Sequence, residues 1–575
     1  MRVSTIVATM AAAMLLGGCR IQIVVPEGGS VASESGTYSC AAGNTCEVDV
    51  VDAMFNESFI ATAADGFEFT GWKQRQLGLC GSGAAKTQPC RLSTVGLAQG
   101  LLDIVLSDDI TVFLEPEFVV FSNEGVAALL ETNADIALAA YTDSLETAQA
   151  LQTAINTFAQ NPTQENLDAA KQAWLVSREP YGQTEVYRFR LSPIDSTDYT
   201  EENGPEGEIN AWPLGEALID YVQVAEPDFG FDQVGIVESS TPVNDGGQVD
   251  GLDSSNNIIG NASITIDRAL LDSTFTAEDE RDVIAGYHAI EFLLWGQDLN
   301  NNAMVTDGTD RIEAVKTLAA GNIAAGGQRP LTDFTSDPLA SRRIAFLQVA
   351  AQKLVDDLQS VVDGWQDGVE GNYRDQFTSF TTRDEAIQRI TEILTGMGTL
   401  SEGELAGERM QIAYSANSQE DEHSCFSDNT HRDMLLNALG ISNSYFGSYA
   451  GYDGDLDGTV DETTRAVNGY GFDDYAAALD VSSLTEIVTL LESRLSETST
   501  NMDELDAMAR NGMPFDVLIQ DASRDSDSPI FKAIISLNQQ SISIADLAER
   551  LAIDVDVVDD DASECDTTNP DTTCG

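Results

Sequence analysis

Basic side chains are scarce in this 575-residue chain. It has 29 Lys and Arg against 95 Asp and Glu, a formal net charge of −66, and only three His. A surface of this sign repels phosphate backbones, so the composition excludes a nucleic-acid-binding role. Hydrophobic residues make up 42% and charged residues 22% of the chain. It can therefore bury sizeable cores, and it is not a mainly disordered protein.

Long hydrophobic runs are missing as well. After the N-terminus no segment has 18 apolar residues in a row, so the sequence predicts no membrane-spanning helix. The apolar run at 6–16 is too short to span a bilayer and is typical of an export signal. It ends in Leu16-Gly17-Gly18-Cys19, which resembles a bacterial lipobox.

This resemblance implies that residues 1–18 are a lipoprotein signal peptide and that Cys19 carries the lipid. An ordinary signal peptide with a chance Cys is the alternative. Arg20 follows the Cys, where inner-membrane lipoproteins usually have Asp. The lipoprotein resemblance therefore implies a protein anchored to the outer membrane, facing the periplasm or the cell surface.

Cysteine is sparse and shows no CxxC zinc pattern among its eight residues. Six of them form close pairs in the sequence, Cys40/Cys46, Cys80/Cys90 and Cys565/Cys574. In an exported chain such pairs favour local disulfides, although spacing alone does not fix the connectivity. Cys425 has no close partner in the sequence, and we expect a buried, inert thiol rather than a ligand.

The first part of the mature chain has the pattern of a β structure. Residues 19–120 contain short runs rich in β-branched and aromatic residues, separated by Gly, Asn and Ser clusters. We predict a small β module that bears disulfides. The phrase Gly66-Phe67-Glu68-Phe69-Thr70-Gly71-Trp72 resembles a signature of small bacterial surface repeat domains, which implies a spacer or an adhesion module.

From about residue 125 the apolar residues recur at three- and four-residue spacing, which predicts helices. The fold class is therefore mainly α: two tandem antiparallel helical bundles, 122–330 and 331–555, and an acidic tail at 556–575. Residues 190–262 are rich in Gly, Asn and Asp, and we expect mostly loop there. The predicted helices cover 125–160, a segment from 163 with a break near Pro180, 276–297, 336–366, 375–397, 484–498 and 526–551.

The segment around His288 carries the first candidate site. His288 and Glu291 are three residues apart, so on a helix they share one face, among apolar residues that indicate burial. A buried imidazole and carboxylate need partners. They can bind a cation, as in metal sites of helical bundles, or simply hydrogen bond to each other and order the core.

Gly286-x-His288-x-x-Glu291 resembles the GxHxxE motif of the imelysin family. The resemblance spans about 122–550 and implies an all-helical, two-bundle envelope lipoprotein that is linked to iron uptake and historically classed as a metallopeptidase. Further segments resemble this family and its iron-regulated protein A branch: 174–189, 204–213, 326–334, 403–410 and 420–433.

The sequence lacks the HExxH motif of zinc peptidases, in which two His bind zinc and a Glu is the base. A third ligand would have to come from another helix, and Glu185 is a candidate, although Arg178 and Arg188 nearby could instead neutralise the carboxylates. Carboxylates with one imidazole suit iron or another divalent cation. We therefore favour binding of a metal ion or iron complex. A zinc metallopeptidase and a surface adhesion or structural protein are the alternatives.

Two further acidic clusters are candidates. His423, Asp428 and His431 lie in a polar stretch that reads as a loop entering a helix, with Ser427 or Asp428 as N-cap. They could form a second half of the His288 site, or only a capped, solvated turn.

Asp453, Asp455, Asp457 and Asp461 copy the front of an EF-hand calcium loop, with Gly458 at its sixth position. Position twelve is Thr rather than the expected Glu. This makes a solvated acidic loop the alternative to a calcium site.

Overall fold

The protein consists of two compact units, which are treated separately below: residues up to 122 with 478–481, and residues 123–477 with 482–575. The structure is a computed structural model. It describes residues 20–50, 52–64, 66–107, 110–212, 214–221, 257–272, 283–298, 326–327, 329–417, 421–479, 481–519, 526–551, 553 and 565–574.

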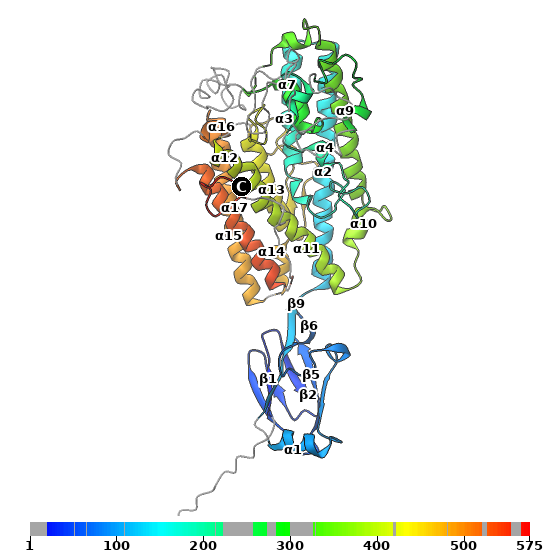
Figure 1. The fold of residues 1–575 in the computed structure, drawn as a ribbon, viewed down its shortest axis with the longest axis vertical. Helices are drawn as coiled ribbons and strands as arrows, with labels where there is room; N and C mark the ends of the chain where they lie inside the picture. Colours follow the sequence, from blue (N-terminus) through cyan, green and yellow to red (C-terminus); the bar gives the residue numbers. More distant parts are fainter. Residues whose placement is uncertain are drawn as a thin grey trace, which may run out of the picture. The chain divides into compact units, whose positions relative to one another are not determined.

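The first unit is the predicted β module (Figure 1). Its strands form a sheet in the order β4-β1-β8, in which β1 and β8 are parallel, an antiparallel sheet in the order β3-β2-β5-β7, and a β6-β9 pair. One helix that the sequence did not predict, α1 (Gln99–Ser107), lies between β7 and β8. The strands are β1 Arg20–Val24, β2 Gly29–Ser33, β3 Ser39–Cys40, β4 Thr45–Asp49, β5 Asn56–Ala63, β6 Phe67–Trp72, β7 Cys90–Ser93, β8 Thr111–Leu114 and β9 Pro116–Val120.

Alternating side chains of these strands build the core of the β unit. Ile21 and Ile23 of β1 point inward together with Val31, Phe59 and Trp72, as the period-two pattern of a half-buried strand requires. The predicted local disulfides Cys40–Cys46 and Cys80–Cys90 are confirmed, and so is Cys565–Cys574 near the C-terminus. Disulfides compensate for the small core that a unit of this size can bury.

The second unit is mainly helical, as predicted. Between 190 and 262 its described residues form only short helices, in agreement with the expected loop character. Its elements are α2 Asn123–Gln160, α3 Gln164–Gly182, η2 Glu185–Tyr187, α4 Glu206–Ile209, α5 Glu216–Ile219, α6 Arg268–Asp272, α7 Gly286–Trp295, η5 Leu331–Phe334, α9 Ala340–Trp365, α10 Tyr373–Thr378, α11 Arg383–Thr399, η6 Leu400–Gln411, α12 Ile412–Ala416, α13 Thr430–Phe446, β10 Ser448–Tyr449, β11 Val467–Asn468, α14 Phe472–Leu479, α15 Ser482–Arg510, α16 Phe515–Leu518 and α17 Pro529–Arg550.

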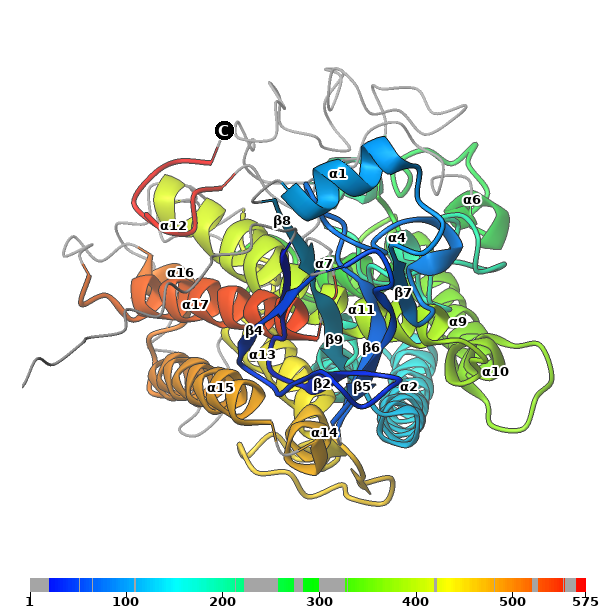
Figure 2. The same cartoon turned by 90° about the horizontal axis from the view of Figure 1, so that it is seen from below.

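The long helices pack in two groups. In the first, α2 packs on α3 and α9, and α7 packs on α3 and α9. In the second, α17 packs on α15, α11 and η6, and α13 packs on α15 (Figures 1 and 2). Helix α9 therefore belongs with the earlier helices, which differs from the expected division at residue 330. The two groups meet where α13 packs on α3 and α11 on α2.

Several helix boundaries differ from the prediction. Helix α15, expected at 484–498, runs from Ser482 to Arg510. Of the helix expected at 276–297, the structure shows α7, which begins at Gly286. Residues 283–285 are not helical, and 276–282 lie outside the described residues. The helix expected at 375–397 is split into α10 and α11, and Thr382 caps α11 with a capping box. Helix α11 then continues into η6, a π-helical segment.

Among the described residues, no helix is long and apolar enough to cross a membrane. The predicted signal peptide and Cys19, the predicted site of the lipid, lie outside the described residues, as does half of the acidic tail.

Candidate functional site

The site is built around α7, a ten-residue helix that is buried on all sides. Its first residue, Gly286, has a φ of +82°, and a Cβ there would lie 2.3 Å from the backbone oxygen of Ile209 at the end of α4. Glycine is therefore required where α7 passes α4. This close approach brings the segment after α4, with Asn210 and Trp212, onto the face of α7 that carries His288.

His288 and Glu291 form the predicted pair on one face of α7. Nδ1 of His288 lies 2.9 Å from Oε2 of Glu291, and neither side chain is exposed. The other oxygen of Glu291, Oε1, accepts hydrogen bonds from the backbone N–H (2.9 Å) and the hydroxyl (2.6 Å) of Ser427. Both carboxylate oxygens therefore have partners within the protein.

The second nitrogen of His288, Nε2, is buried and has no hydrogen-bond partner in the described part of the chain. Its ring contacts that of His423, with centroids 4.8 Å apart in an edge-to-face arrangement, and that of Trp212, with centroids 5.0 Å apart. The structure thus brings together His288 and His423, which are 135 positions apart in the sequence, as expected.

Polar contacts hold His423 in place from the other side. Its Nε2 lies 3.5 Å from the amide nitrogen of Asn210 and 3.5 Å from a guanidinium nitrogen of Arg178. Arg178 on α3 is itself fixed by two hydrogen bonds of 3.1 Å to Asp433 on α13. The site therefore joins α3 and α7 of the first helix group to α13 of the second.

Glu185 is part of the same cluster but is neutralised by arginines. It accepts hydrogen bonds from Arg409 (2.8 Å) and Arg188 (3.3 Å), and from the amide of Asn210 (3.4 Å). Burial alone would raise the pKa of Glu185, but Arg409 and Arg188 lower it to about 2. Glu185 thus carries a full charge that is already compensated.

The imidazoles of His288 and His423 are both neutral at ordinary pH. Burial, followed by the nearby Arg178 and Arg409, lowers the pKa of His288 and of His423 well below the usual value. Burial raises the pKa of Glu291 to about 8, although Ser427 opposes this change. At ordinary pH His288 is therefore neutral and the carboxyl of Glu291 favours its protonated form. If a bound cation displaces the carboxyl proton, Nδ1–H of His288 donates to Glu291 and Nε2 presents a lone pair to the metal.

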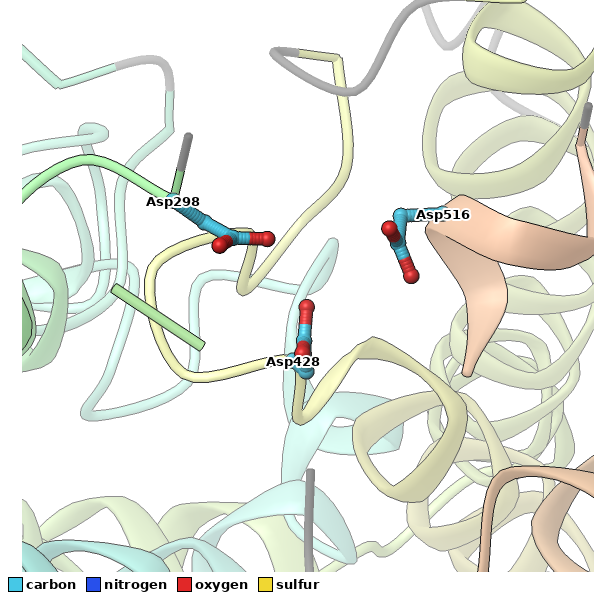
Figure 3. Close-up of side chains that lie close together, drawn as sticks. All are labelled: Asp298, Asp428 and Asp516. Atoms are coloured by element: carbon cyan, nitrogen blue, oxygen red, sulfur yellow. The ribbon is translucent and has the colours of Figure 1, made fainter. Parts of the chain in front are cut away.

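The other predicted residues lie elsewhere. His431 lies 3.8 Å from Asp506 on α15. Asp428 does not cap α13, because Asn429 is its N-cap residue and Asp428 has a φ of +58°. The side chain of Asp428 points instead toward Asp298 and Asp516 (Figure 3). Cys425 is buried, as expected.

The EF-hand-like loop folds around Asp453. This buried carboxylate accepts hydrogen bonds from the backbone of Leu456 (2.7 Å) and Asp457 (3.2 Å), and from Gly458 (2.6 Å). One oxygen each of Asp453, Asp455 and Asp457 lie within 4.8 Å of one another. The carboxylate of Asp461 is not part of this group and accepts from the backbone of Gly454. Calcium binding here stays a prediction.

Sequence reasoning did not single out three contributors to the site: Asn210, Trp212 and Arg409. All three stand in segments that resemble the imelysin family, so the resemblance pointed to these segments, but nothing in the sequence predicted the contacts of the three side chains. Arg409 lies in the π-helical turn of η6, and helical periodicity does not predict such a turn.

A comparison with known protein families identifies the family of this chain. The imelysin family model matches residues 137–544. The chain belongs to the imelysin family. A stretch of 67 residues is 40% identical to iron-regulated protein A of Synechococcus elongatus, covering 12% of this imelysin and 17% of that relative. The match thus spans about a sixth of the relative's length.

Two solved structures resemble this imelysin. One is described as a candidate iron-regulated protein A precursor from Parabacteroides distasonis, with 17% identity and a TM-score of 0.44. The other is an imelysin-like protein from Psychrobacter arcticum, with 12% identity and a TM-score of 0.40. Each likeness covers 75% of this chain and 95% of the other.

Proposed function

We propose that this imelysin is a cell-envelope lipoprotein that binds a metal cation, iron first, at His288 and His423 and takes part in iron uptake. The observation that carries the proposal is the buried, unpartnered Nε2 of His288. A buried polar atom without a partner is rare in native proteins and calls for a ligand. Membership of a family with an iron-regulated relative supports iron as that ligand.

The residues present fit a cation at this position. Metal-bound imidazoles commonly donate their second N–H to a carboxylate, which fixes the tautomer and the orientation of the ring. Glu291 stands in that place behind His288, and Ser427 holds Glu291. His423 supplies the second imidazole, and Asn210, which donates to Glu185, lies beside it. Glu291 thus acts behind the ligand and not as a free hydrolytic base, which favours binding over peptide hydrolysis.

Calorimetric titration of ferrous iron under anaerobic conditions tests the proposal. We expect binding by the wild-type protein and loss of binding by His288→Ala and His423→Ala. His431→Ala is the matched control, because His431 is also buried but lies 3.8 Å from Asp506 and takes no part in the ring contact between His288 and His423. Equal affinities in the wild type and a folded His288→Ala variant would show that the His–Glu pair only orders the core. Hydrolysis of a protein substrate that requires zinc and His288 would favour the peptidase alternative.

Anchoring to the outer membrane forms the second part of the proposal. The Leu16-Gly17-Gly18-Cys19 sequence supports it. The Cys19→Ser variant should move from the membrane fraction to the soluble fraction, whereas Cys425→Ser, which changes a buried thiol, should not. Mass spectrometry that finds an unmodified Cys19 in the mature wild-type protein would refute the anchor.

A further inference from the structure

Three buried aspartates from distant parts of the sequence converge in the helical unit. Asp298 follows the end of α7, Asp428 stands in the loop before α13, and Asp516 lies in α16. One carboxylate oxygen of each lies within 4.8 Å of the other two, and the side chains are turned toward one shared space (Figure 3). Their exposed fractions are 7%, 4% and 3%, so solvent screens their repulsion poorly.

A second observation points to a ligand at this cluster. One oxygen of Asp428, Oδ2, accepts a hydrogen bond of 3.0 Å from the backbone N–H of Gly326. The other oxygen, Oδ1, is buried and has no hydrogen-bond partner among the residues that the structure describes. Leaving a buried carboxylate oxygen unsatisfied is costly. Such an atom is expected only where an ion or water completes its contacts.

The backbone holds this oxygen in position. Gly326 has a φ of +53°, and a Cβ there would lie 2.3 Å from the backbone oxygen of Phe426. The two chain segments therefore approach each other closely. Asp428 cannot simply turn away without losing the hydrogen bond from Gly326. The aspartate is therefore fixed facing the other two carboxylates.

The electrostatics of Asp428 agree with a bound cation. Burial, and then the neighbouring Asp298, Asp516 and Glu422, raise the pKa of Asp428 well above the usual range. Asp428 therefore favours its protonated form without a cation, and a bound cation would replace that proton.

We propose that Asp298, Asp428 and Asp516 form a binding site for a calcium ion. All three donors are carboxylate oxygens, which hard cations prefer. Oxygens within 4.8 Å of one another fit a single calcium shell, in which each Ca–O distance is about 2.3–2.6 Å. Magnesium, which is bound through one or two carboxylates and keeps its water, fits a buried set of three carboxylates less well.

The site also has a structural consequence. The loop at 421–429 carries Asp428, and it carries His423 and Ser427, which complete the His288 pocket. A cation between Asp298, Asp428 and Asp516 ties this loop to the end of α7 and to α16. Calcium would thus fix the loop that closes the pocket.

The test is a thermal unfolding series on the full chain, first stripped with a chelator and then titrated with calcium or magnesium. The wild type should gain several degrees of midpoint temperature in calcium, because a ligand that binds only the folded state stabilises it. Magnesium should give a smaller rise. Asp428→Asn and Asp516→Asn should lose the calcium-dependent rise.

Two controls keep the result interpretable. In chelator, Asp428→Asn should be at least as stable as the wild type, since the Asn keeps an acceptor for Gly326 and cannot ionise beside the other two carboxyl groups. The Asp455→Asn/Asp457→Asn double variant, which alters the other acidic cluster, should keep the part of the calcium response that Asp428→Asn removes. No calcium response in the wild type, or an unchanged response in a folded Asp428→Asn variant, would overturn the proposal.

Discussion

Nδ1 of His288 and Oε2 of Glu291 lie 2.9 Å apart on one face of α7. The remaining oxygen of Glu291 is held by two hydrogen bonds from Ser427, a residue of the loop that precedes α13. Ser427 therefore holds Glu291, and Glu291 in turn contacts His288. Glu291 orients His288, and His288 presents Nε2 to the pocket.

Removing the ionisable carboxyl of Glu291 should weaken metal binding. Glu291→Gln keeps the shape, but its neutral amide cannot become a carboxylate when a cation binds, so it accepts more weakly from Nδ1–H of His288. We expect iron affinity to fall about 10- to 100-fold, the usual effect of losing a residue that supports a metal ligand. Calorimetry measures the affinity, and circular dichroism checks the fold. Ser427→Ala retains the carboxylate and should cost less; an equal loss in both variants would contradict the assigned role of Glu291.

Arg178 should be essential for stability. Its guanidinium and the Asp433 carboxylate are both fully buried, so Arg178→Ala leaves an uncompensated buried charge. We expect a loss of about 3–5 kcal/mol in the free energy of unfolding. Arg494→Ala breaks a pair with the half-exposed Glu497 and should cost about 0.5 kcal/mol or less. Urea unfolding measures the free energy of unfolding of both variants. Similar losses would mean that the buried Arg178–Asp433 pair contributes no more to stability than the exposed one.

His431 should make the protein sensitive to mild acid. Burial lowers the pKa of His431 from 6.5 to about 4, with Arg432 and Arg510 acting in the same direction and Asp506 opposing them. The unfolded state therefore binds more protons between pH 4 and 6.5, and stability falls as the pH decreases through this window. From pH 7 to pH 5 the contribution is about 2 kcal/mol.

Urea unfolding of the wild type and of His431→Gln at both pH values checks this expectation. His288 and His423 are common to both proteins, so the difference between the two pH dependences reports His431 alone. Identical pH dependences would show that His431 does not titrate as stated.

Calcium should strengthen iron binding if both proposed sites exist. Asp428 lies in the same loop as His423 and Ser427, so fixing Asp428 should pre-organise the pocket. We expect the affinity for ferrous iron to rise in calcium in the wild type and to stay unchanged in Asp516→Asn. A calcium effect that persists in Asp516→Asn would show that calcium does not act on iron binding through this aspartate cluster. Unchanged iron affinity in the wild type would mean that the loop is already ordered.

Much of the fold was predictable because the spacing of apolar residues along the sequence indicates helices and strands without knowledge of distant contacts. The strands of the β unit and the long helices α2, α9, α15 and α17 follow it closely. The start of α7 at Gly286 was not predictable, since it is set by the contact with Ile209, which lies far away in the sequence. Helix α9 joined the earlier helices for a similar reason: periodicity shows which face is buried but not which neighbour covers it.

The candidate site was predictable in part. The pairing of His288 with Glu291 follows from their spacing, and the approach of His423 follows from the family resemblance. The role of Asp428 did not follow, because its partners Asp298 and Asp516 come from segments that only the tertiary fold brings together. Nothing in the sequence around Asp516 marks it as a member of a cluster.

Anomalous diffraction at the iron absorption edge, from crystals soaked in ferrous iron, tests the central claim most directly. The account predicts a single strong peak within bonding distance of Nε2 of His288 and beside the ring of His423, and its loss in crystals of His288→Ala. No peak in the pocket, with Nε2 of His288 bonded to a water molecule or a protein group, would contradict it.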